Sequence, residues 1–313
     1  YNSIKPAWFT NTSEFWTKMK ECGVTTGALA RAAAGGWEFF NGDVNQYYNK
    51  LHREEKSQRH PTNVETFAVH RWLGPKHSTV EQYVVVRDAV RGAHPSADAA
   101  GFRVFDAGCG LGAGLSWFET HEPRWELVGH TISEEQWRFI QNELPAHNFK
   151  TFLKSFDEPD GTFDAIYGIE AFIHSPDGTK TLQAWYNALQ PGGVIAILDD
   201  FLADGVDRAA EEVELFAKSW LGNTLLTVAQ MTQLASTVGL GLVQDRDIGK
   251  EYRVAEVNYQ NTVPDIAIDG AKTHQGWMGA KLRHRLTVRG SLTYRLLVFT
   301  KSKTPKHNAK YPK

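Results

Sequence analysis

Short apolar runs alternate with amphipathic stretches over residues 101–200, and this alternation sets the fold that we expect. Each run has the length of a buried strand, and each intervening stretch has the spacing of a helix. The predicted strands lie at residues 103–105, 125–129, 149–153, 163–169 and 194–198. Because strands that alternate with helices are typical of a parallel sheet covered by its crossover helices, the pattern predicts an α/β core.

Two capping-box patterns predict where helices of this core begin. Ser133-Glu-Glu-Gln136 precedes one amphipathic stretch, and Thr227-Val-Ala-Gln230 precedes another, which Gly239 would end. Late apolar runs at 240–243 and 295–299 add two more strands. The chain is therefore predicted to form an open sheet of seven strands with helices on both faces.

Three parts of the chain fall outside this pattern. Residues 1–100 read as helical but mixed, and we expect them to form a cap over the carboxyl edge of the sheet, as a substrate region. Segments 203–222 and 249–290 are predicted to be lids inserted into the core at 101–300. The last residues, 301–313, carry five lysines and two prolines and read as a frayed basic tail.

Composition narrows the class of partner. Hydrophobic residues make up 42% of the 313 residues and charged residues 22%, a balance that can bury a large core and excludes wholesale disorder. A formal net charge of −2 argues against nucleic acid, and no apolar run approaches the roughly 18 residues of a membrane span. We therefore expect a small-molecule partner, and a homo-oligomer is compatible with this composition.

Cysteine usage bears on the compartment. Only Cys22 and Cys109 occur in the chain, which favours a reducing compartment and hence a cytoplasmic location. The opening residues lack the charged-then-apolar layout of a secretion signal. Because the chain starts at Tyr1 rather than at Met, removal of an upstream targeting segment stays an open alternative.

A glycine-rich turn follows the first predicted strand and marks a candidate cofactor site. The turn begins at Asp106 and carries Gly108, Cys109, Gly110 and Gly112. Its backbone can touch a ligand, and the spacing fits either S-adenosylmethionine or a dinucleotide. The acid ahead of the glycines favours S-adenosylmethionine, because a carboxylate would repel a pyrophosphate but attract the ammonium of that cofactor.

The end of the second predicted strand supports the same choice. A dinucleotide site needs an acid there for the ribose hydroxyls, whereas this chain has His130 and Thr131. Methyl transfer is therefore favoured over hydride transfer.

Three motifs between residues 131 and 193 carry a resemblance to a known family. They are Thr131-Ile-Ser-Glu-Glu-Gln136, the stretch Glu158 to Asp177 with its I-E-A-x-x-H-x-P spacing, and Leu189-Gln-Pro-Gly-Gly193. With these motifs the core from about 101 to 201 resembles the class I S-adenosylmethionine-dependent methyltransferases. It is most similar to the sterol, tocopherol and geranyl diphosphate C-methyltransferases and the cyclopropane synthases. The resemblance implies a seven-stranded Rossmann-like methyltransferase sheet and S-adenosyl-L-methionine as cofactor.

Two departures from the relatives limit what the resemblance implies. The chain lacks the aromatic-glycine block with which sterol methyltransferases begin, which argues against a sterol acceptor. Ile173 stands directly before the histidine, where cyclopropane synthases place a glutamate, so cyclopropane formation is disfavoured.

The resemblance and the glycine-rich turn together define a cofactor-binding set. The turn would lie beneath the amino-acid half of the cofactor, and residues 155–157 stand where the class holds the adenine ring. Gln136 has an open alternative, because the Ser133 capping box predicts a helix cap without any ligand. The expected set is Asp106, Gly108, Cys109, Gly110, Gly112, Thr131, Gln136, Ser155, Phe156, Asp157 and Glu170.

A smaller set is predicted for the reaction and the methyl acceptor. Glu170 and His174 are the candidate catalytic residues, with a salt bridge, a helix cap or an ordinary histidine hydrogen bond as alternatives. The candidate substrate-binding residues are Tyr47, Tyr48, His70 and Trp72, which could instead belong to the core.

Two charged runs stay outside these sets. The pair Asp199-Asp200 lacks the further ligands that a metal needs, so no metal is predicted. The run Arg283-His-Arg285 could meet an anionic group such as a diphosphate, but a solvated surface is the interpretation that we favour.

The expected chemistry follows from the sulfonium, whose methyl group is already activated. Alignment and exclusion of water can supply on the order of 7–11 kcal/mol, and a carbon–carbon double bond as acceptor would leave a carbocation for a base to deprotonate. The leading expectation is C-methylation of a small, apolar, isoprenoid-like acceptor. N- or O-methylation of a small metabolite, an NAD-type oxidoreductase and a non-catalytic binding module are the alternatives.

Overall fold

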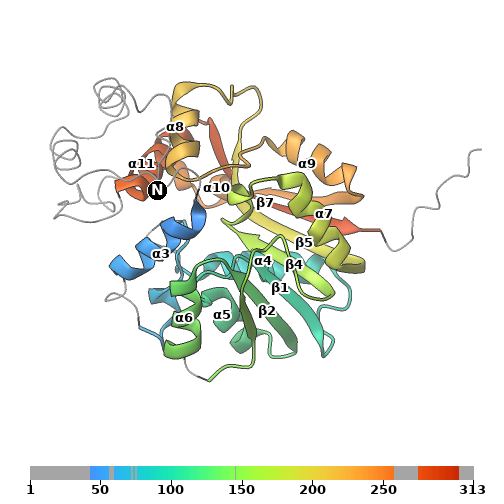
Figure 1. The fold of residues 1–313 in the computed structure, drawn as a ribbon. Coiled ribbons are helices and arrows are strands. Elements are labelled where there is room, and N and C mark those ends of the chain that lie inside the picture. Colours follow the sequence, from blue (N-terminus) through green and yellow to red (C-terminus); the bar gives the residue numbers. More distant parts are fainter. Residues whose placement is uncertain are drawn as a thin grey trace, which may run out of the picture.

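The computed structural model describes residues 43–55, 60–71, 73–74, 76–144, 146–256 and 274–302, which form one seven-stranded sheet with its helices (Figure 1). The strands are β1 Phe102–Ala107, β2 Trp125–Thr131, β3 Lys150–Leu153, β4 Phe163–Ile169, β5 Leu189–Leu202, β6 Leu240–Asp247 and β7 Leu292–Lys301. Their order across the sheet is β3-β2-β1-β4-β5-β7-β6, with β7 antiparallel to both of its neighbours. The predicted seven-stranded α/β sheet is confirmed.

Strands β5, β6 and β7 are longer than predicted, and β5 shows why. The expected strand ended at Leu198 because two aspartates follow it, but β5 continues to Leu202. Its last residues pair with β7, where Asp200 lies opposite Tyr294, and both aspartates are buried. The carboxylates have partners in the protein, and this allows the strand to continue through them.

Alternate residues along each strand face different helices. Val104 belongs to one buried cluster, with Tyr83, and Phe105 belongs to the other, with Trp185. The first cluster includes residues of α4 Glu81–Ala93, α5 Ala113–His121 and α6 Glu134–Glu143. The second includes residues of α7 Gly178–Ala188 and α9 Val228–Thr237. The predicted helical cover on both faces is therefore present.

Both predicted capping residues begin their helices. At α9 the box is complete, because Thr227 Oγ1 accepts from Gln230 N at 3.1 Å while Gln230 Oε1 accepts from Thr227 N at 2.9 Å. At α6 only half of the box forms. Ser133 Oγ accepts from Gln136 N at 3.2 Å, but the Gln136 side chain turns elsewhere.

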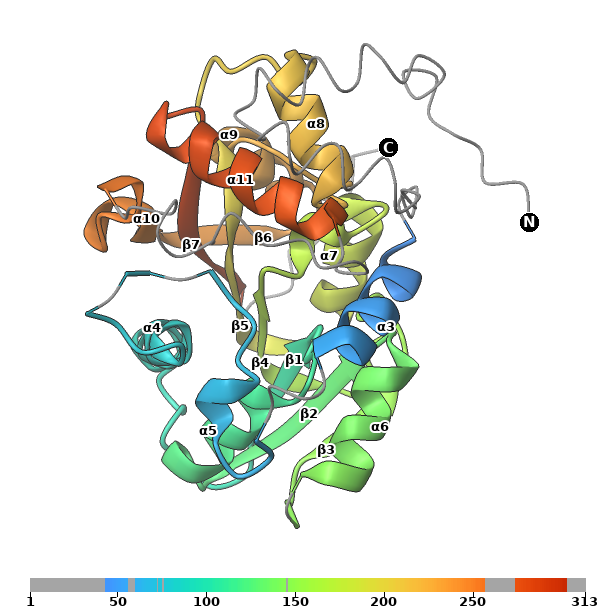
Figure 2. The same ribbon diagram turned by 90° about the vertical axis from the view of Figure 1, so that its left-hand side faces the viewer.

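The segments outside the sheet pattern contribute the remaining elements. These are α3 Val44–Glu55, α8 Glu211–Ser219, α10 Ile248–Glu251, α11 His274–Val288 and the 3-10 turns η3 Val64–Thr66, η4 Phe172–His174 and η5 Val254–Glu256. Helix α3 packs on α6, and α11 packs on α8 (Figure 2). None of the described helices is long and apolar enough to cross a membrane.

Candidate active site

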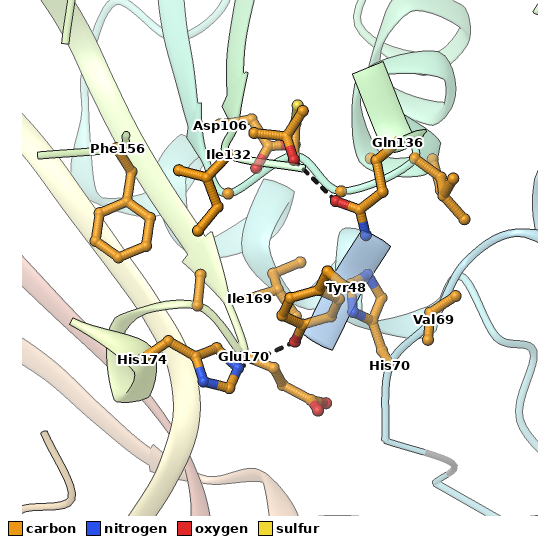
Figure 3. A pocket seen from close by; sticks show the side chains of 18 of the residues that line it. Tyr48, Val69, His70, Asp106, Ile132, Gln136, Phe156, Ile169, Glu170 and His174 are labelled. Atoms are coloured by element: carbon orange, nitrogen blue, oxygen red, sulfur yellow. Dashed lines mark hydrogen bonds between the residues drawn. The ribbon is translucent and has the colours of Figure 1, made fainter. Parts of the chain in front are cut away.

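A cavity of about 220 Å³ lies at the carboxyl ends of β1, β2 and β4 (Figure 3). The strand order reverses between β1 and β4, and in open α/β sheets ligands bind at such a point. Helix α3 and residues 67–71 close one side of the cavity, and Trp220 and Arg283 contribute from the segments that carry α8 and α11. Residues from segments 1–100, 203–222 and 249–290 thus line the same cavity.

The glycine-rich turn has two glycines on the cavity and one behind it. Gly108 and Gly110 line the cavity with φ of +97° and +52°, values that L-residues rarely adopt. Gly112 does not line it: a Cβ there would lie 3.2 Å from Ile140, so this glycine allows the turn to pack on α6. Cys109 lines the cavity and fixes the turn to β2, because its N–H donates to the carbonyl of His130 at 2.8 Å.

Asp106 is a buried carboxyl group at the edge of the turn. The hydroxyl of Tyr167 donates to Asp106 Oδ2 at 2.5 Å, and no Lys or Arg of the described residues pairs with it. Burial raises the pKa of Asp106 to about 7, although the Tyr167 hydrogen bond lowers it in part. The site therefore has a place for a ligand cation.

Thr131 and Gln136 form a unit on the cavity wall. The hydroxyl of Thr131 donates to Gln136 Oε1 at 2.8 Å, and the amide nitrogen of Gln136 is directed into the cavity (Figure 3). The backbone N–H of Ser133 donates to Thr131 Oγ1 rather than to Gln136, which explains the missing half of the box. Gln136 therefore does more than cap its helix.

Of the three residues predicted beside adenine, only Phe156 lines the cavity. The carbonyl of Ser155 accepts from His130 Nδ1 at 3.0 Å, and the carboxylate of Asp157 accepts from Thr181. Ser155 and Asp157 thus hold the loop in shape, while the Phe156 ring faces the cavity (Figure 3).

Glu170 accepts three hydrogen bonds at the end of β4. Its Oε1 accepts from Arg71 N at 2.6 Å and from the Tyr294 hydroxyl at 3.0 Å, and Arg283 Nη1 lies 2.9 Å from Oε2. Burial would raise the pKa of Glu170, but the Arg283 guanidinium outweighs burial and holds the pKa below its usual value. The backbone here has φ of +52°, a strained value that these bonds help to maintain.

The salt bridge of Glu170 belongs to a larger buried ionic cluster, consisting of Arg71, Glu170, Asp200 and Arg283. Asp200 Oδ1 lies 2.7 Å from Arg71 Nη1, and its Oδ2 lies 2.5 Å from Arg283 Nε. The favoured interpretation of Arg283 as a solvated surface residue is wrong, since its side chain is 4% exposed. Among the described residues, no group of three or more metal-ligating side chains lies around Asp200 or elsewhere.

His174 and Tyr48 face each other across the cavity. Because Nδ1 of His174 contacts the carbonyl of Leu221 at 3.0 Å, that nitrogen carries the hydrogen. Nε2 then has a lone pair, which accepts from the Tyr48 hydroxyl at 3.0 Å (Figure 3). Burial lowers the pKa of His174 below its usual value, so the imidazole is a neutral base held in one tautomer.

The other predicted acceptor residues lie beside this pair. Tyr47 lines the cavity and its ring meets that of Tyr48 edge-on, with centroids 5.1 Å apart. His70 points into the cavity (Figure 3). Its Nε2 forms a hydrogen bond of 2.8 Å with the Tyr83 hydroxyl. Trp72 lies outside the described residues.

Several residues of the site were not predicted from the sequence, and Arg283 was considered but assigned to a solvated surface. Tyr167 could have been found, because it is the register partner of Asp106 in the neighbouring strand. Arg71, Tyr83 and Arg283 come from the segments that cover the sheet, whose placement no motif in the sequence predicts.

Comparison with known proteins defines the class. A family model described as a methyltransferase domain matches residues 105–195. The O-methyltransferase rstn1 of Aspergillus nomiae is 30% identical over 162 residues, which cover 45% of this chain and 71% of the relative. The sterol 24-C-methyltransferase erg6 of Aspergillus fumigatus is 28% identical over 131 residues, or 37% of this chain and 32% of the relative.

A solved structure gives the same class at the level of the fold. The cyclopropane synthase MmaA2 of Mycobacterium tuberculosis has a TM-score of 0.59 and 16% identity, with 83% of this chain and 96% of that chain covered. The chain therefore belongs to the class I S-adenosylmethionine-dependent methyltransferases. This membership sets aside the dinucleotide alternative.

The chain spans only part of some relatives. It covers 58% of the methyltransferase GfsG of Streptomyces halstedii, to which it is 27% identical over half of its own length, and 32% of the sterol enzyme. The acceptor and the type of bond that is methylated therefore have to be argued from the site.

Proposed function

We propose that the protein transfers the methyl group of S-adenosylmethionine to a small, largely apolar acceptor, and that carbon is the methylated atom. The observation that carries the proposal is a neutral histidine base, His174, in the same cavity as the glycine-rich turn and Asp106. The turn would support the amino-acid half of the cofactor, with its ammonium at Asp106 and its adenine towards Phe156. The Gln136 amide would then meet a cofactor oxygen.

The acceptor would occupy the half of the cavity between α3 and β4. Apolar and aromatic side chains line this part, among them Leu51, Phe67 and Ile169. In the reaction, the π electrons of a double bond attack the methyl carbon, the carbon–sulfur bond breaks, and neutral S-adenosylhomocysteine leaves. The resulting carbocation lies among aromatic faces, which stabilise a positive charge.

Proton removal would complete the reaction through Tyr48 and His174. The Tyr48 hydroxyl takes the proton from the carbocation's neighbouring carbon while it passes its own hydrogen to His174 Nε2, with which it is already bonded. Glu170 suits a different role, because Arg71, Tyr294 and Arg283 occupy its oxygens. We assign it as a positioning residue whose carboxylate fixes this end of the cavity.

O-methylation is a second candidate, and the same pair of residues favours it. A neutral histidine with a tyrosine hydroxyl on its lone pair is also the arrangement that deprotonates an attacking hydroxyl. The identity to the Aspergillus nomiae O-methyltransferase is in keeping with this candidate.

A labelled-methyl assay separates the candidates. The protein would be incubated with methyl-labelled S-adenosylmethionine and isoprenoid olefins, sterols, quinols and amines, and the new bond would be identified by NMR. We expect label in a C–CH₃ group. Label on oxygen alone would replace the first candidate by the second, and label in no acceptor, with S-adenosylhomocysteine still bound, would contradict both.

The buried carboxyl group of Asp106 predicts how cofactor affinity depends on pH. The cofactor's ammonium binds the ionised form of Asp106. Below the pKa of about 7 the Asp106 carboxyl must first lose its proton, and this weakens the apparent affinity. We expect affinity for S-adenosylhomocysteine to fall about tenfold per pH unit below 7. Calorimetry from pH 5.5 to 9 measures this. In Asp106→Asn the acid limb should vanish, and an unchanged acid limb would contradict the placement of the ammonium.

A further inference from the structure

Five charged side chains of the described residues lie on the wall of the cavity, and they form two groups. Asp106 and Lys154 lie in the half proposed for the cofactor, near the glycine-rich turn and Phe156. The other half contains Arg71, Glu170 and Arg283. Only the second group would face the methyl acceptor.

The second group is electrically neutral once Asp200 is included. Arg71 and Arg283 both contact Asp200, at 2.7 and 2.5 Å, and Arg283 also contacts Glu170 at 2.9 Å. Two positive charges thus meet two negative charges, all of them buried. Burial raises the pKa of both Asp200 and the adjacent Asp199, but only Asp200 has the guanidinium groups of Arg283 and Arg71 to oppose that effect.

The two guanidinium groups are held where they are. That of Arg283 lies 5.0 Å from the ring centre of Trp220 and 5.5 Å from that of Tyr294, and its nitrogens bond both carboxylates. Arg71 is fixed by a second bond, from Nη2 to the Thr287 hydroxyl at 2.7 Å. To meet a phosphate with the nitrogens that now bond Asp200 and Glu170, either arginine would have to give up a buried carboxylate, which would then lie unpaired.

Several buried polar atoms of the cavity wall nevertheless lack a hydrogen-bond partner among the residues that the structure describes. Arg283 Nη2 and His70 Nδ1 are among them in the acceptor half, and His130 Nε2 is one in the cofactor half. An arginine nitrogen is only a donor, so its missing partner is a lone pair, as on an oxygen atom. The neighbouring wall is apolar, with Leu51, Phe67 and Val69.

We propose that the acceptor is an uncharged, largely apolar molecule that carries a hydroxyl or carbonyl oxygen, and that the cavity rejects diphosphates. This proposal rests on the proposed function and narrows its acceptor. A neutral oxygen satisfies the Arg283 donor without adding charge. A diphosphate would place uncompensated negative charge beside Glu170 and Asp200 in a site that excludes water, where an unpaired charge is costly.

The test compares two probes that share the geranyl chain and differ at one end, geraniol with a neutral hydroxyl and geranyl diphosphate with a larger, negatively charged diphosphate. Both are titrated calorimetrically into protein saturated with S-adenosylhomocysteine, so that they meet only the acceptor half. We expect geraniol to bind at least tenfold more tightly than the diphosphate. Equal or tighter binding of the diphosphate would overturn the proposal.

Two variants make the test independent of the shape of either probe. Asp200→Asn and Glu170→Gln each remove one negative charge and leave the acceptor half with a net charge of +1. In both variants, the affinity for geranyl diphosphate relative to that for geraniol should rise at least tenfold. Two separate substitutions are used because Asp200→Asn leaves a buried arginine with one partner fewer and could fail to fold. A cooperative thermal transition close to that of the wild type shows that each variant is intact.

Glu212→Gln is the matched control, since Glu212 pairs with Arg285 and Arg289 away from the cavity. The ratio of the two probe affinities in Glu212→Gln should equal that of the wild type. If the folded variants lose both probes alike, the cluster has only a structural role and the proposal is wrong. If the wild type binds S-adenosylhomocysteine but neither probe, the isoprenoid acceptor of the proposed function is wrong. The proposal about charge is still tested in that case, because it requires the variants to gain affinity for geranyl diphosphate.

Discussion

Gly110→Leu should reduce affinity for S-adenosylhomocysteine by at least a hundredfold while the protein remains folded. Gly110 lines the cavity with φ of +52°, and a Cβ at this position would meet only the Gln136 amide, at 3.9 Å. The protein therefore has space for a side chain at position 110, but the cofactor would occupy the same space, so a leucine there would exclude it. Calorimetry measures the affinity, and the melting temperature reports the fold.

The backbone strain of this substitution needs its own control, because leucine at a positive φ costs roughly 1–2 kcal/mol. Gly205 has φ of +80° in an exposed turn, and a Cβ on it would have no neighbour within 4 Å, so Gly205→Leu brings the same strain without touching the cavity. It should bind the cofactor product normally. Normal binding by Gly110→Leu would contradict the placement of the cofactor.

His174→Asn should lower kcat by about 10²- to 10⁴-fold, the usual contribution of a general base. The asparagine amide can still donate to the Leu221 carbonyl, as Nδ1 does, but it has no basic nitrogen to accept the hydrogen of Tyr48. Affinity for S-adenosylhomocysteine should change little. Steady-state kinetics with the acceptor found in the labelled assay separates kcat from KM.

The pH profile distinguishes a base from a packing residue. Burial lowers the pKa of His174, so the wild-type rate should stay high below pH 6.5 and fall only once the imidazole is protonated. That acid limb should be absent in His174→Asn. Tyr48→Phe should lower kcat by a similar factor, because it removes the hydroxyl that relays the proton to His174. His121→Gln, which changes an exposed histidine stacked on Trp117, should leave kcat unchanged. Parallel losses of kcat and cofactor affinity in His174→Asn would make it a binding residue instead.

The core of the fold could be predicted from the sequence because its signals are local. Apolar runs of strand length, glycines after the first of them and caps such as Thr227 each depend on neighbours in the chain. The position of Asp106 and Gly108 on the cavity could be predicted for the same reason, since a strand and a turn place them together.

The acceptor half could not be predicted because it depends on contacts between distant segments. Arg71 meets Asp200 across 129 positions of the chain, and Arg283 meets it across 83. In sequence, Arg283 stands in a run with His284 and Arg285 that reads as solvated. Its burial depends on a carboxylate that no local pattern links to it, and Gly112, assigned to the cofactor from its spacing, proved to serve packing on α6.

The ion pairs of Asp200 connect two walls of the cavity, the segment of Arg71 and helix α11, to the sheet, and this bears on how an acceptor can enter. Moving the segment of Arg71 or helix α11 away from the sheet would leave a buried charge unpaired, at a cost of about 3–5 kcal/mol. We therefore expect these two walls to move little. The bonds of helix α3 include neutral ones, from Tyr48 to His174 and from Ser133 to Asn49, and a surface ion pair of Arg53. We therefore expect the acceptor to enter on the side of α3, where the Tyr48 hydroxyl would both relay the proton and bond this helix to His174.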